Sequence, residues 1–65
     1  MYNAQLETFV VVAENGSFFK AAEKLYITPT AVMKQINALE KRVGAKLLER
    51  SNHGLFLTDA GRSFL

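Results

Sequence analysis

A helix predicted over residues 29–43 carries, on one side, polar side chains of the kinds that contact nucleic acids. At about 100° per residue, four of them lie within about 60° of one another: Thr30, Lys34, Asn37 and Lys41. A lysine can contact a guanine edge or a phosphate, an asparagine can pair with adenine, and a threonine can hydrogen-bond a base or touch a thymine methyl. Met33 lies at the edge of this face, where it can pack on a thymine methyl. The alternative is a solvated polar face, which any surface helix has.

The residues around this helix predict how it is positioned. Thr28 is a suitable N-cap, and Pro29 follows at the first helical position, where its missing N–H costs nothing. A short helix, capped by Ser17, is predicted just upstream, and Tyr26 and Ile27 form the turn between the two helices. Two helices joined by such a turn form a helix-turn-helix, which places its second helix in the DNA major groove. The predicted inner face of both helices consists of Phe18, Ala21, Ala22, Leu25, Val32, Ile36, Leu39 and Val43.

The rest of the chain predicts a third core helix and a hairpin. Asn3 is the expected N-cap of a first helix, which ends at Gly16 and whose apolar stripe is Leu6, Phe9, Val10 and Ala13. Beyond Gly44, two short strands are predicted over residues 46–50 and 55–58, joined by the turn residues 51–54. Thr58 then caps a fourth helix. Because the chain ends after about two turns of that helix, we expect it to be a piece of a longer protein.

Composition narrows the function classes. The 65 residues include no Cys and one His, so neither a disulfide framework nor a zinc site of the usual ligand number is available. Net charge is +2, but residues 17–53 carry +4 while residues 1–16 carry −2, which suggests a polyanionic partner. His53 stands alone on a predicted loop, so we expect no enzyme. No signal peptide or membrane span is predicted, and we expect a cytoplasmic protein without a cofactor.

The order and spacing of several short motifs resemble the N-terminal DNA-binding domain of LysR-type bacterial transcriptional regulators. The matching segments are Gln5-Leu6-Glu7-Thr8-Phe9, Glu14-Asn15-Gly16-Ser17-Phe18, Ala21-Ala22-Glu23-Lys24-Leu25, Ala31-Val32, Lys34-Gln35-Ile36, Leu39-Glu40, Leu47-Leu48-Glu49-Arg50 and Leu57-Thr58-Asp59-Ala60-Gly61. The resemblance implies a mainly α winged helix-turn-helix over residues 1–58. It also implies that residues 59–65 begin a truncated linker helix. In such regulators the linker helix dimerises, and a separate domain, absent here, binds a small-molecule effector.

The resemblance further implies how the chain binds double-stranded DNA: helix 29–43 lies in the major groove and the wing, residues 50–55, at the minor groove. The family's usual run at the start of the recognition helix is Ser-Gln-Pro-Ala-(Val/Leu)-Ser, whereas this chain has Thr28-Pro29-Thr30-Ala31-Val32-Met33. The wing position usually held by an arginine is His53 here. The docking geometry is therefore expected to carry over, but the base contacts are not.

Lys20, Arg50 and Thr28 are further candidates for phosphate contacts, the first two with an alternative. Lys20, at the start of the second helix, contacts a phosphate or is a solvated surface charge. Arg50, at the foot of the wing, contacts a phosphate or pairs with a nearby glutamate. The N–H groups around Thr28 can bind a phosphate at the start of a helix. His53 enters the minor groove, more strongly when protonated, or is an ordinary turn residue.

A second class of function is a winged helix that binds another protein. That use is expected where the recognition face has lost its positive charge, and Lys34 and Lys41 argue against it. A longer protein of the resembled family is expected to be a homodimer or tetramer, because two recognition helices must be spaced by about one turn of DNA or a multiple.

Overall fold

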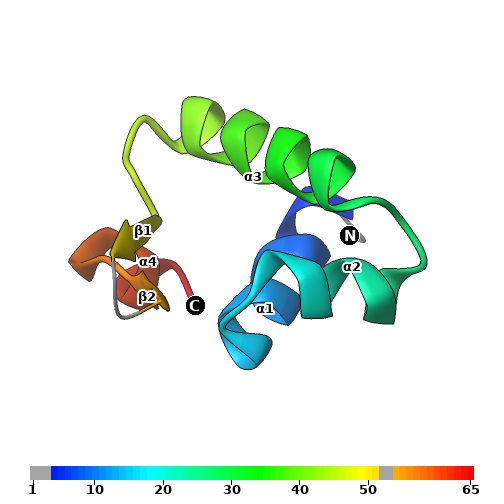
Figure 1. Ribbon diagram of the computed structural model, residues 1–65. Coiled ribbons are helices and arrows are strands. Elements are labelled where there is room, and N and C mark those ends of the chain that lie inside the picture. Colours follow the sequence, from blue (N-terminus) through cyan, green and yellow to red (C-terminus); the bar gives the residue numbers. More distant parts are fainter. Residues whose placement is uncertain (1–3, 52–53) are drawn as a thin grey trace.

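The computed structural model describes residues 4–51 and 54–65 (Figure 1). The elements in order are α1 (Ala4–Asn15), α2 (Phe18–Leu25), α3 (Pro29–Val43), β1 (Leu48–Ser51), β2 (Gly54–Leu57) and α4 (Asp59–Phe64). In Figure 1, α3 crosses over α1 and α2. A loop leads from the C-terminal end of α3 to the hairpin, and α4 lies beside the hairpin. The predicted mainly α architecture, with three core helices, a short hairpin and a fourth helix, is confirmed.

Three hydroxyl side chains begin three of the helices, as the sequence predicted. Each hydroxyl accepts a hydrogen bond from the backbone N–H three residues later, which satisfies one of the donors that a helix start leaves unpaired. The pairs are Ser17 with Lys20 at 3.3 Å, Thr28 with Ala31 at 3.1 Å, and Thr58 with Gly61 at 3.0 Å. The predicted cap of α1, Asn3, lies outside the described residues.

The turn between α2 and α3 is short and has a defined backbone. Tyr26 adopts the left-handed conformation with φ 58°, and its N–H donates to the carbonyls of Ala22 and Glu23. Ile27 follows and packs against the core. Thr28 then begins α3 with an extended backbone, and Pro29 occupies the first turn. The helix-turn-helix predicted from these residues is therefore present.

The buried core joins the three helices to the segment that enters the hairpin. It contains Phe9, Val12, Ala21, Ala22, Val32, Ile36, Leu39, Leu47 and Leu48. Thr8 is also buried, and its hydroxyl donates to the side-chain oxygen of Gln35, which links α1 to α3. Neither this bond nor the burial of Leu47 and Leu48 was predicted, because each depends on segments that meet only in the folded chain.

Two predicted core positions, Leu6 and Val43, are each 39% exposed. Four others are half-buried: Val10, Ala13, Phe18 and Leu25. In α1, apolar residues from Phe9 to Ala13 occupy every side of the helix, so the sequence alone does not define its inner stripe. Val43 is the last residue of α3 and precedes the turn at Gly44, so it lies beyond the helices that cover the middle of α3.

The hairpin is present, but its strands are shifted from the predicted bounds. β1 and β2 pair antiparallel with Leu48 opposite Leu57, Arg50 opposite Leu55, and Ser51 opposite Gly54. Both strands lie closer to the tip of the hairpin than predicted. β1 begins at Leu48 and includes Ser51, and β2 includes Gly54 and ends at Leu57. The prediction followed residue type, and Ser51 and Gly54 are turn-forming residues, yet both take part in the ladder.

The carboxylate of Glu40 fixes the hairpin to the end of α3. Its Oε2 atom accepts hydrogen bonds from the backbone N–H groups of Leu47, at 2.8 Å, and Leu48, at 3.2 Å. Both leucines are buried, so their amides have little access to water. A charged acceptor makes such bonds shorter and stronger than a neutral one.

Removing this carboxylate is expected to loosen the wing. Glu40→Ala leaves two amides without their partner and is expected to lower the free energy of unfolding by about 2 kcal/mol. Glu40→Gln keeps an acceptor oxygen and is expected to cost less. Hydrogen exchange of the Leu47 and Leu48 amides, with chemical denaturation, measures both effects. Glu49→Ala, at an exposed carboxylate on β1, is the control; equal effects at the two positions would contradict the role given to Glu40.

Gly61 permits α4 to pack closely on the segment that precedes the hairpin. A Cβ atom at this position would lie 2.1 Å from the carbonyl oxygen of Leu47. That oxygen accepts the N–H of Thr58 at 3.1 Å, so the first turn of α4 and the entry to the hairpin share one contact point. Backbone lies on the other side of the contact, so no flexible side chain can move to relieve a clash.

Gly61→Ala is therefore expected to destabilise the chain, although alanine is favoured over glycine in a helix by about 1 kcal/mol. Overpacking against backbone is expected to outweigh that gain and to cost about 1–3 kcal/mol. Thermal unfolding and exchange of the Thr58 amide measure the change. Ser63→Ala, at an exposed position of the same helix, provides the control; a Gly61→Ala variant as stable as that control would show that α4 does not need this close approach.

Candidate nucleic-acid interface

One side of α3 is open to solvent along its length. The polar residues predicted to share a face are all exposed, and they are Thr30, Lys34, Asn37 and Lys41. The opposite side carries Val32, Ile36 and Leu39, which are buried against the other core helices. Because the buried side is held by packing, the exposed side has a fixed orientation relative to the rest of the domain. α3 therefore presents a lysine, an amide and a hydroxyl together, which is a chemistry suited to base edges and phosphates.

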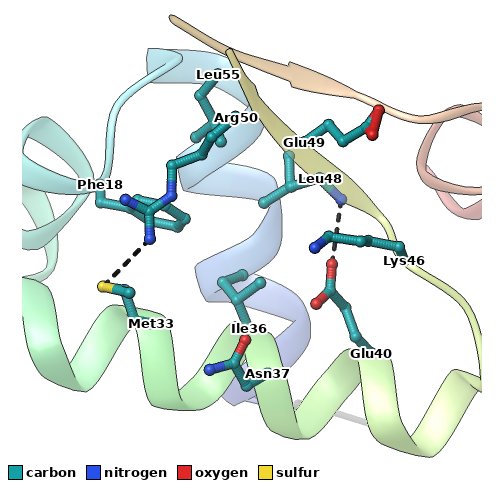
Figure 2. A pocket seen from close by; sticks show the side chains of 10 residues that line it. All are labelled: Phe18, Met33, Ile36, Asn37, Glu40, Lys46, Leu48, Glu49, Arg50 and Leu55. Atoms are coloured by element: carbon teal, nitrogen blue, oxygen red, sulfur yellow. Dashed lines mark hydrogen bonds between the residues drawn. The ribbon is translucent and has the colours of Figure 1, made fainter.

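The hairpin places Arg50 next to this helix. Its guanidinium carbon lies 5.1 Å from the centre of the Phe18 ring, and its Nη2 atom lies 3.9 Å from the sulfur of Met33 (Figure 2). Arg50 is exposed, whereas Met33 is half-buried. The glutamate partner considered as an alternative is not found for Arg50 among the described residues. β1, α2 and α3 thus meet at this cation.

Two shallow hollows lie beside Arg50 and bring several predicted site residues together. A groove of about 510 Å³ lies between the N-terminal ends of α2 and α3 and the hairpin, and its lining includes Pro29, Thr30, Met33 and Arg50. A cleft of about 270 Å³ lies between α3 and the hairpin, and its lining includes Met33, Asn37 and Arg50. The two hollows share Met33 and Arg50 in their linings, so they lie next to each other between α3 and the hairpin.

Three other predicted residues lie outside the linings of these hollows. Lys34 is exposed on the open side of α3, and Lys20 is exposed in the first turn of α2. Thr28 is exposed at the start of α3, and its hydroxyl is engaged as the helix cap. His53 lies outside the described residues.

Phe18 of α2 enters this region through a contact that was not predicted. Phe18 was assigned only to the inner face; it packs partly against the core and also contacts Arg50. Its neighbour Phe19 is 72% exposed and lines the groove. A phenylalanine beside a serine cap gives no sign in the sequence that a distant arginine will lie over it.

In the described ranges, 4–51 and 54–65, no group of three or more His, Cys, Asp and Glu residues is placed to hold a metal ion. None of the helices in those ranges is both long and apolar enough to cross a membrane.

Known sequences similar to this chain are regulators of one family. The family described as "Bacterial regulatory helix-turn-helix protein, lysR family" matches residues 4–62. The transcriptional regulator TfdT of Cupriavidus pinatubonensis is 49% identical over 61 residues, which cover 94% of this chain and 27% of TfdT. The regulator TcbR of Pseudomonas sp. is 44% identical over 61 residues, with 94% and 21% covered. The chain thus spans about a quarter of the length of these relatives.

Solved structures of the same kind match the whole fold. The DNA-binding domain of CbnR, crystallised in complex with DNA, has a TM-score of 0.91 and 43% sequence identity, covering 100% of this chain and 75% of that one. The DNA-binding domain of BenM, crystallised with its catB site 1 DNA, has a TM-score of 0.91 and 41% identity, covering 98% and 72%.

The match over residues 4–62, together with these similarities in sequence and fold, shows that the chain belongs to the LysR family of bacterial regulatory helix-turn-helix proteins.

Proposed function

We propose that this chain binds double-stranded DNA in a sequence-specific manner, as the DNA-binding domain of a bacterial LysR-type transcriptional regulator. α3 lies in the major groove, and the wing, residues 50–55, lies at the minor groove. The observation that carries the proposal is the exposed side of α3, which presents Thr30, Lys34 and Asn37 from the second helix of a helix-turn-helix. The similar CbnR and BenM domains were both crystallised on DNA.

The base contacts are assigned by side-chain chemistry. Lys34 contacts a guanine edge or a phosphate, and Asn37 pairs with adenine. Thr30 hydrogen-bonds a base or contacts a thymine methyl, and the half-buried Met33 packs on a thymine methyl. Pro29, in the first turn of α3, shapes the edge of the groove next to these residues.

The phosphate contacts surround that face. The backbone N–H groups at the start of α3, beside Thr28, bind one phosphate, because a helix N-terminus favours an anion. Lys20 and Arg50 contact phosphates on either side, from α2 and from β1. His53 enters the minor groove, where protonation strengthens its attraction to the DNA.

The remaining assignments concern the longer protein. Residues 1–58 form the DNA-binding domain, and residues 59–65 begin the linker helix. The regulator is a homodimer or tetramer in the cytoplasm, it has no enzymatic activity, and its small-molecule effector binds a domain outside this chain. These proposals are supported by the family match and by relatives that are named as transcriptional regulators and are several times longer than this chain.

An NMR titration of the isotope-labelled chain with a generic duplex tests the docking mode. At low salt, we expect amide shifts to cluster between Thr28 and Asn37 and on the wing, and to weaken at moderate salt because counterion release drives phosphate binding. Shifts confined to α1 and the outer side of α4, or no shifts at low salt, would remove the proposed interface and favour a protein-binding winged helix.

Lys34→Ala separates the two contacts assigned to this lysine. If Lys34 neutralises a phosphate, the variant binds all duplexes more weakly, and the slope of log affinity against log salt falls by about 0.9. If Lys34 reads guanine, the loss is confined to duplexes that contain the preferred guanine. Fluorescence anisotropy at several salt concentrations measures both. Arg62→Gln removes an equal charge from α4 and is the control; no loss with Lys34→Ala, or an equal loss at Arg62, would contradict the assignment.

A further inference from the structure

The guanidinium of Arg50 is held by an aromatic ring and a thioether. Its central carbon lies 5.1 Å above the centre of the Phe18 ring, within the range of a cation–π interaction. Its Nη2 atom points toward the sulfur of Met33 at 3.9 Å. Figure 2 shows the two supporting side chains rising from different helices toward the arginine on β1. Arg50 itself is exposed, so the supports fix its position without burying it.

Neighbouring carboxylates do not take up this charge. Glu49 precedes Arg50 on β1, and successive side chains of a strand point to opposite faces, so Glu49 shares its face with its partner Phe56. Glu40, which also lines the cleft, accepts the N–H groups of Leu47 and Leu48. Arg50 therefore lies near two glutamates, but neither pairs with it, and its charge remains available to a phosphate.

The ring contact has a second consequence for the donors of Arg50. A guanidinium carries five N–H groups in one plane. The Phe18 ring attracts the cation without a conventional acceptor atom, whereas a carboxylate partner would use two of these donors. Among the described residues, the hydrogen bond of the guanidinium is the one directed at Met33, which leaves the other donors for the two oxygens of a phosphate.

We propose that Phe18 is a positioning residue for DNA binding. It holds the Arg50 guanidinium in the orientation that contacts a backbone phosphate, and Met33 limits the rotation of the group about the ring. The inference rests on the proposed function, because Phe18 acts through Arg50, the residue proposed to contact the phosphate. Preorganisation lowers the conformational entropy that a long side chain loses when it binds.

The ring contact is measurable without DNA. In the free chain, the Arg50 guanidinium carbon lies over the Phe18 ring, so we expect the ring current to shift the Arg50 Hε resonance upfield relative to an arginine without a ring contact. Phe18→Tyr keeps an aromatic face and is expected to keep the shift, whereas Phe18→Leu is expected to remove it. An unshifted Arg50 Hε in the unmodified chain would overturn the proposal directly.

The effect on DNA binding is tested by a double-mutant cycle with a generic mixed-sequence duplex at low salt. Phe18→Leu is expected to weaken binding about 2- to 5-fold in the unmodified chain, as expected for an exposed cation–π contact. In the Arg50→Met background, Phe18→Leu is expected to have no further effect. Phe18→Tyr is expected to restore full affinity. A ring that only supports the fold would cost the same with or without the arginine.

Phe56→Leu is the matched control, because Phe56 lies on the other face of the hairpin from Arg50. Its effect on DNA affinity is expected to add to that of Arg50→Met without coupling. Equal losses from Phe18→Leu in both backgrounds would overturn the positioning role while leaving the DNA-binding proposal intact. If the unmodified chain does not bind the duplex at low salt, the proposed function is overturned and this inference with it. The two failures are thus distinct.

Discussion

The position of the wing relative to α3 depends on two hydrogen bonds, which the Glu40 carboxylate accepts from the amides of Leu47 and Leu48. With no Cys, the chain cannot use a disulfide to attach its hairpin, so packing and polar contacts must hold it. Glu40 lies on α3, the helix that presents the candidate DNA-reading face. A side chain of that helix therefore sets the position of the wing relative to it. The side chains of Leu47 and Leu48 are buried in the core and hold the same segment by packing.

Local features of the fold could be predicted from the sequence because their causes are local. Ser17, Thr28 and Thr58 cap the next turn of the same chain, and Pro29 suits only the start of a helix. The polar face of α3 follows from helical periodicity, and its four residues are exposed. The turn residues 51–54 predicted the hairpin, and the family resemblance implied its position at the minor groove.

The features that were not predicted depend on segments that meet only after folding. Leu6 has the right spacing for the inner face of α1, but the direction of that face is decided by where α2 and α3 pack, and Leu6 is 39% exposed. Arg50 was weighed between a phosphate and a glutamate, and neither alternative included an aromatic partner. The ring of Phe18 lies under it because the hairpin returns to the start of α2, a relation that neither residue's neighbours reveal.

These contacts also explain how a modest net charge of +2 is compatible with a polyanionic partner. Electrostatic attraction depends on where charges lie and on whether neighbours cancel them. Glu40 and Glu49 both line the cleft beside Arg50, where they would be expected to oppose a phosphate. Glu40 accepts the amides of Leu47 and Leu48, and Glu49 shares a face of the hairpin with Phe56. Neither carboxylate forms an ion pair with Arg50 among the described residues, so the guanidinium keeps its donors for a phosphate at the place where the wing is fixed to α3.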